Sequence, residues 1–196
     1  MKLTESLQHL KKFTYSIHPL SDEEWSNFAS IWHEDEAKRK TILTAKGETE
    51  KNLYFITEGV QRAYYLTADD KEATIVFTYP FSFSGVADSF LTQTPSKYFF
   101  ETLTQSIFLK TSYSQVAALL DRYPNFERFI RLATAYALKG ALERQVELQT
   151  FSAEQKFTTL LTRSPQVLRL IPHKYLASYL GIDAATFSKL LSTVRV

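Results

Sequence analysis

The spacing of hydrophobic positions changes twice along the chain, from helical to strand-like and back to helical. Near the start, Trp25, Phe28 and Trp32 recur three and four residues apart, which is typical of one face of an amphipathic helix. Ser21 stands before them with Glu24 three residues further on, and this pair predicts a capping box where the helix begins.

Between about residues 37 and 111 the hydrophobic residues form short β-branched and aromatic runs. These runs predict strands at 40–44, 52–57, 60–67, 73–79, 81–83, 98–103 and 106–111. The turn-forming sequence at 68–70 makes a hairpin of the strands on either side of it. Short strands at this close spacing, punctuated by Gly47, Gly59 and Gly85, predict an antiparallel jelly-roll barrel.

Helical spacing returns at Ser112, with a short helix at 113–122 and a long one at 124–150 that contains no proline after Pro124. A seam of alternating four- and three-residue spacing follows this long helix, at Phe126, Ile130, Ala133, Ala137 and Gly140. Because the helix is longer than one small barrel needs, we expect this seam to hold a homodimer. The alternative is that the stripe only covers the barrel.

The last 45 residues predict a helix that ends near Ser164 and then two short helices, at 173–180 and 184–194. Gly181 allows the left-handed backbone of a tight turn between the short helices, and Asp183 is a good N-cap for the second. This arrangement predicts a DNA-binding helix-turn-helix. Its candidate DNA contacts are His173, Lys174, Ala185, Thr186, Ser188 and Lys189. An ordinary helical hairpin is the alternative.

Composition and charge narrow the function. The chain has 196 residues, of which 44% are hydrophobic, and no cysteine, so we expect a packed core without disulfides or thiolate metal sites. Residues 152–196 hold 6 basic and 2 acidic residues, a balance of +4, whereas the rest of the chain holds 17 and 19, a balance of −2. A basic tail on a mildly acidic body is typical of a phosphate-binding module attached to a sensing domain. No apolar run approaches the roughly 20 residues of a membrane span, and no signal peptide is evident, so we expect a cytoplasmic protein.

Enzymatic chemistry has little support in the sequence. No Gly-rich phosphate loop, Gly-x-Ser-x-Gly elbow or His-Glu-x-x-His motif is present. A metal-binding cupin would share the barrel topology, but the four histidines, at 9, 18, 33 and 173, lie outside the predicted barrel. We therefore expect no catalytic residues and no metal.

The chain resembles the Crp/Fnr superfamily of transcription regulators over nearly its whole length. Gly47, residues 52–56 and Glu58-Gly59 are similar to the first barrel signature of that family. Ser84-Gly85 and residues 95–98 are similar to its phosphate-binding cassette. Ala177, Gly181, Ile182, Thr186 and Ser188-Lys189 are similar to its DNA-binding helices.

The resemblance implies an α+β fold in three parts: a cyclic-nucleotide-binding-like barrel with N-terminal helices at 1–123, a dimerisation helix at 124–150 and a helix-turn-helix at 151–196. It implies a regulator that is not an enzyme, that binds double-stranded DNA as a homodimer, and that has a candidate effector site at Ser84, Gly85, Val86, Ser96 and Lys97. The possible ligand is a cyclic nucleotide or another small anionic effector.

Two departures from the family concern the function. The glutamate and arginine with which cyclic-AMP binders hold the ribose and the phosphate are replaced by Val86 and Pro95, so we expect a pocket unsuited to cyclic AMP. Ala184 and Ala185 replace base-reading residues of the recognition helix. The second departure leaves an alternative open, a non-catalytic sensor or interaction module with degenerate DNA binding.

Overall fold

The computed structural model describes residues 3–194. Two helices open the chain, α1 (Leu3–Ile17) and α2 (Asp22–Ser30). The strands are β1 (His33–Ala37), β2 (Ile42–Thr44), β3 (Asn52–Glu58), β4 (Gln61–Leu66), β5 (Glu72–Thr78), β6 (Phe83–Ser84), β7 (Phe99–Thr102) and β8 (Ser106–Ser112), with α3 (Ala87–Thr92) between β6 and β7. The helices that follow are α4 (Tyr113–Arg122), α5 (Pro124–Thr150), α6 (Ala153–Arg163), α7 (Val167–Leu170), α8 (His173–Leu180) and α9 (Ala184–Thr193).

The strands form two four-stranded antiparallel sheets, in the orders β1-β8-β3-β6 and β2-β7-β4-β5. Their facing sides bury an aromatic core in which the ring of Tyr54 lies 5.1 Å from Phe108 and 5.8 Å from Phe100. This arrangement confirms the predicted fold class, an antiparallel jelly roll with flanking helices. The predicted hairpin is also present, because β4 and β5 pair on either side of the turn at 67–71.

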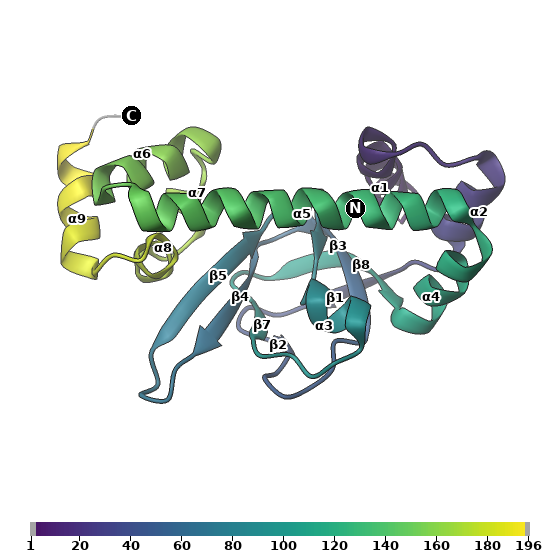
Figure 1. Cartoon of the computed structure of the whole chain (residues 1–196), viewed down its shortest axis with the longest axis horizontal. Coiled ribbons are helices and arrows are strands. Elements are labelled where there is room, and N and C mark those ends of the chain that lie inside the picture. Colours follow the sequence, from purple (N-terminus) through teal and green to yellow (C-terminus); the bar gives the residue numbers. More distant parts are fainter. Residues whose placement is uncertain (1–2, 195–196) are drawn as a thin grey trace.

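The N-terminal helices pack against the first half of α5. Phe28 of α2 is fully buried, with its ring 4.8 Å from Phe126 and 6.1 Å from Phe129 of α5. Leu10 of α1 belongs to the same core. Figure 1 shows the result: α1 and α2 lie at one end of the long helix and α6–α9 at the other, with the strands beneath.

The C-terminal helices share a hydrophobic core with the barrel. Val60, Phe77 and Leu103 of the barrel region pack with Phe157 of α6 and Leu176 of α8. This contact lies beside β5, where Figure 1 places α8. The last four helices are therefore joined to the barrel by buried side chains as well as by the chain itself.

The predicted start of α2 is confirmed, because Ser21 and Glu24 form the capping box. Ser152 with Gln155 forms another one at the start of α6. Three elements were not predicted from the sequence: β1, α3 and α7. The strand β1 has the sequence HEDEA and lacks hydrophobic alternation, and α3 begins at Val86 without a side-chain cap, so neither carries the usual sequence signal. No helix within residues 3–194 is long and apolar enough to cross a membrane.

Candidate effector pocket and DNA-contacting surface

The candidate effector residues begin at the end of β6. Ser84 is buried, and its hydroxyl lies 2.7 Å from the hydroxyl of Thr78 on β5. Gly85 follows with a φ of +123°, a backbone conformation that side chains rarely allow. Val86 is 3% exposed and packs in the core between the sheets. The side chains of Ser84 and Val86 therefore already make contacts with other residues of the barrel.

The second part of the candidate site also makes internal contacts. Ser96 is buried; its hydroxyl donates to the carbonyl of Tyr98 at 2.8 Å and accepts from the Tyr98 amide at 2.9 Å. Lys97 is exposed and is the single cation among the candidate residues. The hydroxyl of Ser96 thus stabilises the backbone turn in which Ser96 itself lies.

Beneath Gly85 lies a buried carboxylate that sequence reasoning missed. Glu50 is 1% exposed and accepts hydrogen bonds from the Thr44 hydroxyl at 2.5 Å, the Asn52 amide at 3.1 Å and the Val86 amide at 3.4 Å. Burial raises the pKa of this carboxyl group above its ordinary value. The carboxyl group of Glu50 thus already accepts the hydrogen bond of the Val86 backbone amide inside the candidate site.

A second buried charge, Arg62, lies on β4. Because Ala63 points into the core between the sheets and side chains alternate along a strand, Arg62 points to the opposite face. It is 1% exposed and pairs with Glu101 at 2.6 Å and with Glu72, and it donates to the Thr74 hydroxyl at 3.0 Å. Strand alternation alone would leave this face in solvent, so sequence reasoning missed the site.

Helix α8 is what covers Arg62. The guanidinium lies between two rings, 4.2 Å from the centroid of Tyr64 on β4 and 3.8 Å from that of Tyr175 on α8. One turn further along α8, the Ser178 hydroxyl accepts from the Thr74 amide and donates to the Glu72 carbonyl, both at 2.9 Å. We call Arg62, Tyr175 and Ser178 the clasp, because they fasten α8 to the β4–β5 hairpin.

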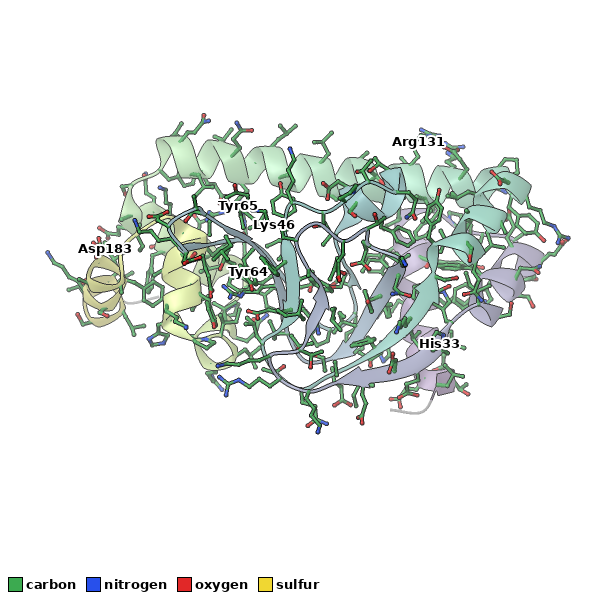
Figure 2. All side chains as sticks on the ribbon, turned by 90° about the horizontal axis from the view of Figure 1, so that it is seen from below. His33, Lys46, Tyr64, Tyr65, Arg131 and Asp183 are labelled. Carbon is green, nitrogen blue, oxygen red and sulfur yellow. The ribbon has the colours of Figure 1, made fainter. Side chains whose placement is uncertain are left out.

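The turn between α8 and α9 has the predicted geometry. Gly181 is left-handed, with a φ of +65°, and ends α8. The Asp183 carboxylate accepts from the Thr186 amide at 2.8 Å and from its hydroxyl at 2.7 Å, and these bonds lower the pKa of Asp183. Phe187 is 1% exposed and anchors α9 against Phe157. Figure 2 shows Asp183 at the outer end of the molecule, away from the strands.

The candidate DNA contacts are mostly accessible. Ala185, Ser188 and Lys189 are exposed on α9, and His173 and Lys174 are exposed at the start of α8. Thr186 is half-buried, and its hydroxyl donates to the cap residue Asp183. The structure therefore gathers these residues on two adjacent helices, and it places Thr186 in the cap of α9.

The predicted dimer seam coincides in part with the core of its own chain. Phe126 is 1% exposed against Phe28, and Ile130 and Ala133 are half-buried in the same cluster. Ala137 and Gly140 are exposed, but helical spacing places them on the side of α5 that carries Arg144. The side chain of Phe126 is consequently buried within its own chain and is not accessible to a second copy. The spacing of the seam could not reveal this packing.

Three exposed apolar side chains of α5 lie on the opposite side. Leu138, Leu142 and Val146 are four residues apart and 59%, 54% and 54% exposed, respectively. Arg131, seven residues before Leu138 and hence on the same face, projects away from the strands in Figure 2. We call Leu138, Leu142 and Val146 the outer stripe of α5.

The sequence and the fold were compared with those of known proteins. Residues 34–123 match the family model described as the cyclic nucleotide-binding domain. No curated protein matches the chain. Similar solved structures include FixK2 from Bradyrhizobium japonicum, which is 18% identical with a TM-score of 0.74, the match covering 83% of each chain.

Two further solved structures have the same fold. The c-di-GMP-responsive global regulator CLP of Xanthomonas campestris is 17% identical with a TM-score of 0.64, and the match covers 88% of this chain and 90% of that one. A transcriptional regulator described as of the Crp/Fnr family, from Eubacterium rectale, is 13% identical with a TM-score of 0.69, covering 88% and 82%. Residues 34–123 are therefore similar to the cyclic nucleotide-binding domain, and the chain shares its fold with solved structures that include a regulator described as of the Crp/Fnr family.

Proposed function

We propose that this protein is a dimeric, DNA-binding transcription regulator of the Crp/Fnr type whose barrel responds to an effector other than cyclic AMP. Its parts are divided by role: residues 1–123 sense, residues 124–150 dimerise and residues 151–196 bind DNA. The observation that carries the proposal is the α8–α9 pair, in which a capped second helix exposes Ala185, Ser188 and Lys189 to solvent.

DNA recognition is assigned to α9. Its buried side, at Phe187, is fixed to the preceding helices, so the exposed side has a defined orientation. Lys189 can reach a guanine edge or a phosphate, and the methyl of Ala185 can contact thymine. Lys174 and His173 at the start of α8 are placed for the phosphate backbone.

Dimerisation is assigned to the outer stripe of α5 rather than to the face of Phe126. A second copy is the occupant that fits, because a long helix with exposed leucines at helical spacing buries them well against its own twin. A two-fold dimer would then present two α9 helices to half-sites about 34 Å apart.

The effector assignment depends on Glu50. Its carboxyl group accepts from the Val86 amide, so a phosphate at the same place would have to displace it from that donor. The glutamate and arginine that the family uses for cyclic AMP are absent at Val86 and Pro95. We expect calorimetric titration with cyclic AMP to show no submicromolar binding; such binding would contradict this assignment.

A salt-dependent gel shift on genomic DNA fragments tests the function. Wild-type protein is expected to retain a subset of fragments at physiological salt, and its affinity should fall steeply as salt rises. If no fragment is retained even in low salt, the regulator proposal fails and the DNA-free sensor module replaces it. The two alanines at 184 and 185 are the feature that favours this second candidate.

A further inference from the structure

A small cavity lies where the barrel meets the last turns of α5, α6 and α8. It has a volume of about 80 Å³ and opens beside the end of α5 at which Figure 1 places α6 and α8. A single water molecule needs only about 10–15 Å³ of such space, so a small organic ligand fits. We call it the junction cavity. None of the candidate effector residues at 84–86 and 96–97 lines it.

The junction cavity carries one net positive charge. Of the described residues that line it, Arg144, Arg163 and Glu147 are the charged ones. Glu147 is 4% exposed, and each of its oxygens is paired, Oε2 with Arg144 at 3.0 Å and Oε1 with Arg163 at 2.5 Å. The negative charge is therefore compensated inside the protein. Within residues 3–194 one positive charge at the cavity has no counter-ion.

Arg144 also has a buried donor without a partner. Its guanidinium lies 4.1 Å from the ring centroid of Tyr179, and its terminal nitrogens donate to Glu147 and to the Tyr179 carbonyl. Its Nε is buried and has no hydrogen-bond partner in the described part of the chain. Because an unsatisfied buried donor is costly, an oxygen supplied by a ligand would be bound favourably there.

Two phenol groups add further donors. Tyr79, just beyond β5, and Tyr179, in the last turn of α8, both line the cavity. Neither hydroxyl has a hydrogen-bond partner among the residues from 3 to 194. Burial raises the pKa of both groups, and the nearby Tyr179 raises the pKa of Tyr79 further. Both phenols therefore stay protonated and remain able to donate to an anion.

The rest of the cavity wall includes apolar side chains. Phe77 of β5 and Leu160 of α6 line it and belong to the core that joins the barrel to the C-terminal helices. A bare chloride would gain nothing from this hydrocarbon, and the second charge of a sulfate would stay uncompensated. A carboxylate with a short hydrocarbon chain matches the single charge, the planar guanidinium donors and the apolar wall together.

We propose that the junction cavity binds a small monocarboxylate of about two to four carbons, with its oxygens toward Arg144 and the two phenols and its hydrocarbon against Phe77 and Leu160. A ligand held there contacts β5, α5, α6 and α8 at once. It therefore stabilises the joint between the barrel and the C-terminal helices. The inference does not depend on DNA binding or on an effector in the barrel.

Propionate is the probe, titrated calorimetrically into wild-type protein at constant ionic strength. Saturable binding is expected, and the urea midpoint should rise with propionate concentration. Chloride and sulfate at the same ionic strength should produce neither effect. Tyr79→Phe is expected to weaken propionate binding roughly tenfold, because it removes one donor to a charged ligand. Its urea midpoint without propionate should stay close to that of wild type, since the hydroxyl has no partner to lose among the described residues.

Tyr136→Phe is the matched control. Tyr136 lies on α5, is 59% exposed and does not line the cavity, so the variant should bind propionate as wild type does. Three results would each overturn the inference: no saturable propionate binding, equal affinity of Tyr79→Phe and wild type, or the same stabilisation by chloride or sulfate. The regulator function would stand in all three cases, because the gel shift tests it separately.

Discussion

At the scale of single residues, the buried Glu50 makes stability depend on pH. Its pKa is raised in the folded protein above the ordinary value of 4.5, so the folded state binds the proton more tightly than the unfolded state. The stability that this contributes is present below pH 4.5 and is lost as pH rises through the folded-state pKa. Other groups titrate too, so the effect is isolated by comparison with a variant.

Glu50→Gln is the variant, because the amide keeps the shape and still accepts hydrogen bonds. We expect it to be more stable relative to wild type at pH 8 than at pH 4.5, as measured by urea midpoints. The exposed Glu48→Gln, two residues away, serves as the control and should shift both midpoints alike. A wild-type minus Glu50→Gln difference that is constant with pH would contradict the raised pKa.

Under the proposed function, Lys189 is the residue of α9 that we expect to contribute most to base reading. If it contacts guanine at two acceptors, Lys189→Ala should weaken specific binding by about 1–3 kcal/mol and relax the sequence preference. Lys174→Ala, at the start of α8, should instead weaken all duplexes alike and flatten the salt slope by about 0.9. Binding isotherms on the selected and a scrambled duplex separate the two effects, and equal behaviour of both variants would remove Lys189 from base reading.

At the scale of elements, the clasp between α8 and the β4–β5 hairpin depends on a buried ion pair. Arg62→Met would leave Glu101 buried without its cation, which should cost about 3–5 kcal/mol of unfolding free energy. The double variant Arg62→Met/Glu101→Leu should recover most of that loss, since it removes both charges. Urea unfolding of the three proteins measures this, and a double variant as unstable as the single one would mean that packing matters more than charge.

The outer stripe of α5 makes a separate prediction. Leu142→Glu places a charge in the middle of the stripe and should convert the dimer to monomers, as seen by light scattering with sedimentation. Ala137→Glu adds the same charge on the other side of α5, and we expect it to leave the dimer intact. Dissociation by Ala137→Glu alone would return the interface to the face first predicted from sequence.

The features that could be predicted from the sequence are those determined by residues close by in the chain. The capping boxes at Ser21 and Ser152, the left-handed Gly181 and the Asp183 cap each depend on residues within a few positions, and the structure has all of them. The burial of Phe126 and Arg62, by contrast, could not be predicted from the sequence. Their burial is decided by Phe28 and Tyr175, which lie about one hundred positions away in the sequence, and spacing along one helix or strand carries no information about them.

At the scale of the whole molecule, sensing and DNA-binding parts should unfold together. Because Phe77 of β5 packs with Phe157 and Leu176, truncating it removes contacts from both sides of one core. Phe77→Ala is expected to destabilise the protein by about 3–5 kcal/mol and to lower one shared transition. Unfolding followed by tyrosine fluorescence and by helical circular dichroism should give coincident curves, and separate midpoints would show two independent units.

The shared core also limits how this protein can be recombined with its relatives. A C-terminal segment taken from another protein of this fold would have different residues in place of Phe157 and Leu176, shaped for a different barrel surface. To be accepted here, it would have to arrive with matching residues at positions 60, 77 and 103. The C-terminal helices and the adjoining wall of the barrel are thus coupled through one core, and a designer who wishes to exchange one has to redesign the other.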